Sequence, residues 1–140
     1  MTQNKKSPLK YFWLYALKLE SNKYYVGITT KKDPQERIDQ HISGFYGARW
    51  TKKYRPIETL EIKDLGYVSQ EDARHEEKKL TLEYMHKYGY QNVRGADLSY
   101  SGQYVLRFNR FFTDFDYKVM TVIILLLLVI LVQLLDKYIW

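Results

Sequence analysis

The stretch KYYVGITTKKDPQERIDQHISG, residues 23–44, joins a strand signature to a helix signature. It begins with tyrosine and β-branched residues, which favour strands. Asp33 then supplies an N-cap, Pro34 fits the first helical position, and Glu36 occupies the capping-box position. The stretch therefore predicts a strand followed by a helix that ends before Gly44.

Two further strands flank this unit. Residues 11–19 (YFWLYALKL) are a second β-rich run, and residues 20–22 between the two runs are typical of a hairpin turn. The first run lacks the small-residue cleavage pattern of a signal peptide. Residues 57–65 (IETLEIKDL) alternate apolar and polar side chains, which predicts a third strand.

A second helix follows the third strand. Ser69 begins its capping signal, and the helix is expected to reach about Tyr88 and to end at Gly89. A loop is predicted at residues 45–56, and irregular or short-stranded structure at residues 90–109. The order strand-strand-helix-strand-helix predicts a small α+β domain.

The charge is uneven along the chain. The net charge of +6 lies on residues 1–118, because Asp136 and Lys137 in the tail cancel. Such a surface favours polyanions, either nucleic acid or acidic lipid headgroups. The absence of cysteine excludes disulfides and thiolate metal sites.

The C-terminal tail has the composition of a membrane span. Residues 119–135 contain only Thr121 and Gln133 as polar residues and carry no charge. These seventeen residues would span about 25 Å as a helix, and extension to Trp140 gives the length needed for a hydrocarbon core of about 30 Å. The alternative is a buried core helix, but this segment has no polar face. The sequence therefore predicts a transmembrane helix over residues 119–140 in a lipid bilayer.

Aromatic and basic residues flank the predicted span. The aromatic residues expected at the two membrane interfaces are Phe111, Phe112, Phe115, Tyr117, Tyr138 and Trp140. The basic residues on the N-terminal side are Arg107, Arg110 and Lys118, against the acidic Asp114 and Asp116. The positive-inside rule then predicts a single-pass membrane protein with its domain in the cytoplasm.

Several polar residues fall where a site could form. Tyr15 and Tyr25 lie on the two paired strands, where ordinary cross-strand packing is the alternative. Gly27 indicates a bulge or the close approach of another group, such as a phosphate. Arg37 and His41 share a helix face at i, i+4, which suits phosphate binding and proton transfer, with a solvated face as the alternative.

A glutamate lies on the apolar side of the second helix. The apolar stripe of that helix consists of Ala73, Leu80, Tyr84 and Tyr88. Glu77 projects near the middle of this stripe, whereas Glu76 projects to one side. A buried carboxylate is costly unless it is paired or bound to metal, and Mg²⁺ is often bound by one or two carboxylates and water. Glu77 is therefore a candidate metal ligand, with an ion pair to Arg or Lys as the alternative.

Together these residues resemble the GIY-YIG endonuclease family over residues 10–97. The residues that carry the resemblance are Trp13-Leu14-Tyr15, Tyr25-Val26-Gly27, Arg37, His41, Glu77 and Asn92. Trp13 and Leu14 depart from the glycine and isoleucine of the first element, and Val26 departs from the isoleucine of the second. The resemblance implies a small three-stranded antiparallel sheet flanked by helices. It also implies metal-dependent cleavage of nucleic-acid phosphodiester bonds, with DNA as the expected substrate.

The family pattern implies a role for each residue at the reaction centre. Tyr15 would be the general base or would orient the attacking water, and Tyr25 would hydrogen-bond near the scissile phosphate or nucleophile. Arg37 would neutralise charge that develops on the phosphate. His41 would support proton transfer or contact the phosphate. Glu77 would anchor Mg²⁺ or Mn²⁺.

Other residues are expected around this centre. Gly27 would keep the strand edge open for substrate, and Asn92 would fix backbone near the site. The predicted nucleic-acid contacts in the loop are Arg49, Lys52, Lys53 and Arg55. Trp50 in the same loop is expected to pack into the core. A solvated loop is the alternative for these charges.

The sequence thus predicts a membrane-anchored nuclease without a small-molecule cofactor. Its predicted parts are an N-terminal tail (1–9), a nuclease domain (10–100), a juxtamembrane segment (101–118) and a transmembrane helix (119–140). One alternative is a tethered nucleic-acid-binding module that cleaves little. Another is a lipid-headgroup contact, which would explain the charge but not the inward glutamate.

Overall fold

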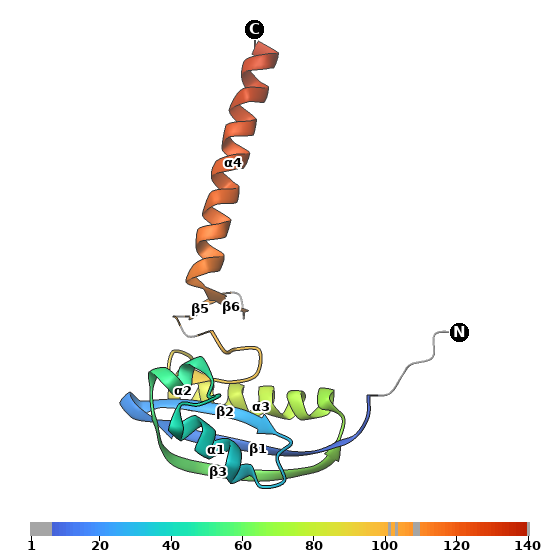
Figure 1. Cartoon of the computed structure of the whole chain (residues 1–140). Coiled ribbons are helices and arrows are strands. Elements are labelled where there is room, and N and C mark those ends of the chain that lie inside the picture. The colour runs from blue at the N-terminus through green and yellow to red at the C-terminus, as the bar shows by residue number, and fades with distance from the viewer. Residues whose placement is uncertain (1–6, 101, 103, 108–109, 140) are drawn as a thin grey trace, which may run out of the picture. The chain divides into compact units, whose positions relative to one another are not determined.

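A computed structural model of the chain contains two units, Met1–Ser101 and Gly102–Trp140 (Figure 1). The structure describes residues 7–100, 102, 104–107 and 110–139. The first unit is an α+β domain, and the second contains a short hairpin and a long apolar helix.

The first unit is built on a four-stranded sheet in the order β3-β1-β2-β4. Strand β1 (Lys10–Leu19) pairs antiparallel with β2 (Lys23–Thr29) and with β3 (Pro56–Val68). The short β4 (Val93–Arg94) adds to the edge of β2 in parallel. The prediction of three strands was therefore wrong by one, because a strand of two residues is too short to give an alternating pattern.

The β1–β2 hairpin has the predicted position. A short 3-10 turn, η1 (Glu20–Asn22), joins the strands, and both Ser21 and Asn22 adopt positive φ angles of 57° and 53°. In the register, Tyr15 lies opposite Gly27 and Leu17 lies opposite Tyr25. Because side chains two residues apart share a face, Tyr15 and Tyr25 are diagonal neighbours on one side of the sheet.

Both predicted helices are confirmed. In α1 (Pro34–Ser43) the Asp33 side chain accepts a hydrogen bond from the Gln35 amide at 2.8 Å, and Gly44 ends the helix with φ of 76°. The Glu36 carboxylate lies 3.4 Å from the Lys31 ammonium. The local capping chemistry therefore sets both ends of this helix.

The helix α3 (Gln70–Tyr88) begins and ends where the sequence predicts. The Ser69 hydroxyl accepts from the Asp72 amide at 3.1 Å, and the Gly89 amide donates to the Met85 carbonyl at 2.9 Å. The buried stripe of α3 is Ala73, Glu77, Thr81 and Met85. Ala73 and Glu77 are buried as predicted, but Thr81 and Met85 follow them in the buried stripe. Leu80, Tyr84 and Tyr88, which were predicted to lie in this stripe, are half-buried.

Two local expectations need correction. The predicted loop contains a short helix, α2 (Arg49–Lys53), which lacks a side-chain cap and so carries no capping signal in the sequence. The third strand is longer than residues 57–65, because β3 follows β1 along its whole length with three register irregularities. Trp50 in α2 is buried as expected, and its indole N–H donates to the Tyr24 carbonyl at 3.1 Å.

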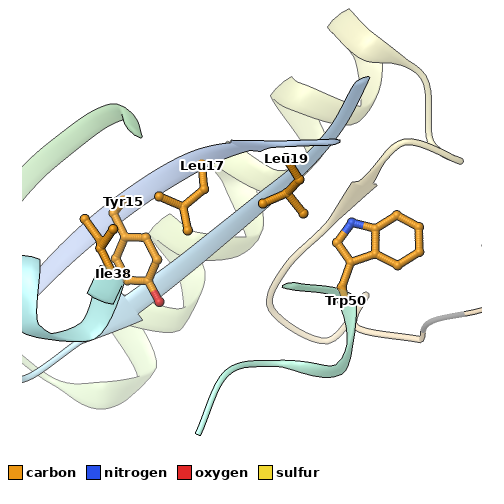
Figure 2. Packing of buried hydrophobic residues seen from close by; sticks show 5 residues of the cluster. All are labelled: Tyr15, Leu17, Leu19, Ile38 and Trp50. Atoms are coloured by element: carbon orange, nitrogen blue, oxygen red, sulfur yellow. The ribbon is translucent and has the colours of Figure 1, made fainter. Parts of the chain in front are cut away.

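Helices cover both faces of the sheet. On one face, Tyr15, Leu17 and Leu19 of β1 form an apolar cluster with Ile38 of α1 and Trp50 of α2 (Figure 2). On the other face, the core residues are Leu14, Ala16 and Val26, with Leu80 and Tyr84 of α3 packed against them. Burial of each large apolar side chain stabilises the fold by about 1.5–3 kcal/mol. This packing fixes α1 over the face that carries Tyr15.

The second unit consists of β5 (Tyr104–Arg107), β6 (Arg110–Thr113) and α4 (Asp114–Ile139). Within α4, residues 115–135 form one segment long and apolar enough to cross a membrane. The side chains of residues 118–135 are exposed in this unit. The side chains of Arg107, Arg110, Phe111, Phe112, Asp114, Tyr138 and Trp140, which were assigned interfacial positions, lie outside the described residues.

Gly95, next to β4, provides a test of the packing between β2 and α3. A Cβ atom at this position would lie 2.5 Å from the Thr81 hydroxyl and 2.7 Å from the Val26 carbonyl oxygen. Because the Val26 oxygen belongs to a paired strand and cannot move freely, Gly95→Ala should lower the free energy of unfolding by about 1–3 kcal/mol. Urea unfolding of residues 1–101 measures this. The exposed Ser99→Ala is the control and should change stability by less than about 0.5 kcal/mol; equal effects of the two variants would contradict the close packing.

Candidate active site

The centre of the candidate site is a buried contact between a tyrosine and a histidine. The Tyr15 hydroxyl on β1 lies 2.8 Å from His41 Nε2 in the last turn of α1. Both side chains are only 1% exposed. This contact supplies a partner for the Tyr15 hydroxyl and for His41 Nε2, since an unpaired buried polar group is costly.

The other ring nitrogen of His41 is held by Thr51 of α2. His41 Nδ1 lies 2.8 Å from the Thr51 hydroxyl and 3.4 Å from the Ala48 amide nitrogen. The Thr51 hydroxyl also lies 3.0 Å from the Ala48 carbonyl oxygen. When Thr51 donates to that carbonyl, it accepts from His41 Nδ1–H, and Nε2 is then free to accept the Tyr15 proton.

Thr51 is a site residue that the sequence analysis missed. It is 1% exposed and belongs to α2, which was predicted as a loop. No spacing rule connects Thr51 to His41, because the contact depends on how α2 packs against α1. The sequence therefore contains no usable signal for it.

Tyr25 and Gly27 complete the sheet side of the site. The Tyr25 ring lies 4.9 Å from the His41 ring and 6.4 Å from the Tyr15 ring, between centroids. A Cβ atom at Gly27 would lie 2.6 Å from the Tyr15 hydroxyl and 3.0 Å from the Tyr25 ring. The space beside Gly27 is therefore filled by the two tyrosines, and a side chain there would displace them.

Arg37 lies one turn before His41 and is half-buried. Its Nη1 donates to the Gln40 side-chain oxygen at 2.8 Å and to the Tyr46 carbonyl oxygen at 2.9 Å. Both partners are neutral, so these two bonds orient the guanidinium without cancelling its charge. Such a guanidinium is suited to bind a phosphate.

Burial keeps the tyrosine–histidine pair neutral. Desolvation, together with the nearby Tyr25, raises the pKa of Tyr15 far above its usual value, although Arg37 acts in the opposite direction. Desolvation and then the charge of Arg37 lower the pKa of His41 to about 4. At neutral pH the phenol therefore keeps its proton, and the imidazole is able to accept one.

Glu77 comes from α3, on the other face of the sheet. It is 9% exposed, and burial raises its pKa, while a hydrogen bond from the Ala96 amide and the charge of Arg74 lower it. Its charge reaches the tyrosines: burial and then Glu77 raise the pKa of Tyr25 to about 12. By contrast, Glu76 is half-buried and its carboxylate pairs with Lys63 at 3.3 Å.

The donor set allows a metal site with few protein ligands. No group of three or more His, Cys, Asp or Glu side chains suitable for a metal occurs within the described part of the chain. Glu77 instead offers one inward carboxylate, which the Ala96 amide orients. One carboxylate completed by water and substrate oxygens fits Mg²⁺, which retains several waters when bound.

Asn92 lies away from the phenol–imidazole contact. Its side-chain oxygen accepts from the Lys23 ammonium at 2.6 Å, and its side-chain nitrogen donates to the Tyr88 carbonyl at 2.8 Å. Its backbone carbonyl accepts from the Tyr24 amide at 2.8 Å. Asn92 therefore joins the end of α3 to the start of β2.

The predicted basic contact residues lie in and just after α2. Arg49, Lys52, Lys53 and Arg55 are all exposed. Their neighbour Thr51 points inward to His41, so one short helix presents cations to solvent and a hydroxyl to the site.

Comparison with known proteins gave one match. Residues 11–91 match the family model described as the GIY-YIG catalytic domain, which is more than half of the chain. No curated protein and no solved structure gave a significant match.

The buried state of His41 predicts a specific pH dependence of stability. Its pKa is about 4 in the folded protein against a usual 6.5, so the unfolded chain binds more protons between these values. The free energy of unfolding should therefore fall by up to about 3 kcal/mol as the pH drops from 6.5 to 4. Urea unfolding of residues 1–101 at a series of pH values measures this.

Two variants isolate the contribution of His41. His41→Gln should lack this acid-dependent loss, whereas His75→Gln, at an exposed position, should retain it. Because the pKa of Glu77 is raised, its contribution to the free energy of unfolding increases as the pH falls, opposite to that of His41. Glu77 is present in the wild type and in both variants, so the difference in their pH dependence reports His41. The same pH dependence in both variants would contradict the assignment.

Proposed function

The chain belongs to the GIY-YIG family of nucleases, and on that basis we propose that it is a divalent-metal-dependent endonuclease. Its proposed substrate is nucleic acid, with DNA expected, and its proposed reaction is hydrolysis of a phosphodiester bond. The observation that carries this proposal is the buried contact at 2.8 Å between the Tyr15 hydroxyl and His41 Nε2, beside Arg37, which donates to the neutral Gln40 side chain and Tyr46 carbonyl.

Arg37 and Glu77 would bind the reacting phosphate from two sides. The Arg37 guanidinium would donate to a non-bridging phosphate oxygen and offset the negative charge that grows during attack. Glu77 would hold Mg²⁺ or Mn²⁺ through its carboxylate, with the Ala96 amide fixing the orientation of that group. When bound, such a cation polarises the phosphate and stabilises the leaving oxygen.

Tyr15 and His41 would together accept the proton of the attacking water. The raised pKa of Tyr15 argues against a preformed phenolate. As the water attacks phosphorus, its proton would pass to the Tyr15 oxygen while the Tyr15 proton passes to His41 Nε2. This relay leaves Tyr15 neutral and forms an imidazolium, and Tyr25 would hydrogen-bond to the phosphate or the water beside them.

The basic residues of α2 would bind the nucleic-acid backbone outside this centre. Arg49, Lys52 and Lys53 are exposed cations on the helix whose inward Thr51 holds His41. A binding module that cleaves little would use these cations as well. It would not need the buried glutamate, whose burial costs free energy without a metal or an ion pair.

We further propose that α4 anchors the protein in a membrane. Residues 115–135 comprise 21 residues, which span about 31 Å as a helix and match a hydrocarbon core of about 30 Å. Their exposed apolar side chains need a nonpolar environment. Lys118 lies at the N-terminal end of this segment, which supports a cytoplasmic location for the catalytic domain.

The nuclease proposal predicts cleavage that depends on one glutamate and not on its neighbour. Residues 1–101 should nick supercoiled DNA with Mg²⁺ or Mn²⁺, and EDTA should abolish the nicking. Glu77→Gln and Arg37→Gln should each lower the rate by about 100-fold or more, because each removes a group that stabilises charge in the transition state. Glu76→Gln, which breaks only an exposed pair with Lys63, should retain the rate.

Two results would contradict this assignment. One is nicking that survives EDTA or the Glu77→Gln substitution. The other is metal-independent DNA binding with no cleavage of any substrate, which would favour the binding module.

The membrane proposal is tested by extraction. The full chain should stay in the membrane pellet after alkaline carbonate treatment, because removing a 21-residue apolar helix from lipid is strongly unfavourable. Chains that end at residue 101 or residue 118 should appear in the supernatant. Retention of the shorter chains in the pellet would show that the anchor lies elsewhere.

A further inference from the structure

An aromatic pair on the loop between α1 and α2 has no part in the mechanism above. Phe45 is 75% exposed and Tyr46 is 80% exposed, and they follow the half-exposed Ile42 at the end of α1. Exposed single apolar residues are common, but two adjacent aromatic rings that are almost fully in water are not explained by the fold.

The backbone of this loop holds Tyr46 in a strained conformation. Its φ angle is 57°, in the left-handed region that bulky residues rarely adopt. Burial of the ring does not compensate for this strain, since the ring is exposed. Arg37 does compensate for it, because its guanidinium donates to the Tyr46 carbonyl at 2.9 Å. Strain of this kind is concentrated at ligand sites.

The same loop also holds His41. The Ala48 carbonyl accepts from the Thr51 hydroxyl at 3.0 Å, and that hydroxyl lies 2.8 Å from His41 Nδ1. Residues 45–48 are therefore tied to both polar groups that α1 contributes to the site. A ligand seated on the aromatic pair would act directly on the position of Arg37.

A shallow surface depression, widely open to solvent, lies at this loop. Its lining residues are Ser43, Gly44, Phe45, Tyr46 and Lys52. The lining combines aromatic rings with a cation. Aromatic faces stack on nucleobases of any sequence, and lysine pairs with the phosphates that connect them.

We propose that Phe45 and Tyr46 form a stacking platform for an unpaired base of the substrate. This proposal rests on the proposed nuclease function and narrows its substrate class. A base can reach the platform only if it is outside the duplex stack, so the enzyme selects nucleic acid with unpaired bases next to the scissile phosphate. The hydrogen bond between Arg37 and the platform, with the exposed Lys52 beside it, favours this occupant over a lipid surface.

The test measures binding rather than cleavage. The full chain is reconstituted in nanodiscs as Glu77→Gln, so that the substrate survives. Affinities are measured by fluorescence anisotropy for a perfect DNA duplex and for the same duplex with central unpaired bases. The affinity ratio should favour the unpaired substrate, and 2-aminopurine placed at the unpaired position should be quenched by stacking.

The decisive variant is Phe45→Ala with Tyr46→Asn, since asparagine tolerates a left-handed backbone. It should lower the preference for unpaired bases by about tenfold or more while binding to the perfect duplex stays unchanged. The single variant Phe45→Ala leaves residue 46 intact and should lower the preference in part. Tyr67→Ala, which removes a tyrosine that is 73% exposed on β3, is the control and should leave the preference unchanged.

An unchanged ratio in the double variant would overturn the proposal. This outcome is separate from failure of the nuclease proposal. A wild-type chain that cleaves DNA but whose preference ignores Phe45 and Tyr46 retains the first proposal and loses the second. A chain that stacks unpaired bases but never cleaves retains the stacking platform and loses the nuclease proposal.

Discussion

The hydrogen bond between the Tyr15 hydroxyl and His41 Nε2 is the contact around which the catalytic domain is arranged. It joins β1 to α1 between two side chains that are each only 1% exposed, so the loss of either group would leave the other short of a buried hydrogen-bond partner. Ile38 and Trp50 hold α1 and α2 on that face of the sheet, and Gly27 leaves the space that the phenol occupies. A change in the apolar packing would therefore alter the distance between Tyr15 and His41. The same contacts thus hold the fold together and position the candidate catalytic groups.

Local signals in the sequence predicted most of the fold. Asp33 and Ser69 act within one helical turn, so the starts of α1 and α3 follow from the residues beside them. The pairing of β4 with β2 and the helix α2 could not be predicted, because two strand residues and an uncapped five-residue helix exist only through their neighbours. The inward position of Glu77 followed from helical periodicity, whereas the contact of Thr51 with His41 depends on tertiary packing alone.

Burial and charge together make this site neutral where we propose proton transfer and positive where phosphate would bind. Desolvation raises the pKa of Tyr15 and lowers that of His41, so a neutral phenol faces a neutral imidazole at physiological pH. Arg37 donates to an amide oxygen and a backbone carbonyl and keeps its full charge nearby. A carboxylate partner for Arg37 would have cancelled that charge. Two acidic residues of α1 have other partners. Glu36 pairs with Lys31, and Asp39 accepts a hydrogen bond from the Gln35 side chain.

This distribution of charge gives substrate binding a direct effect on the proton relay. The charge of Arg37 is one of the two causes that lower the pKa of His41. A phosphate bound to Arg37 would offset that charge, and the proton affinity of His41 would then rise. The imidazole would thus become a better acceptor for the Tyr15 proton at the moment when the scissile bond is in place. A bound phosphate would thus favour the proposed relay, while burial, the larger cause of the lowered pKa of His41, would still oppose its protonation.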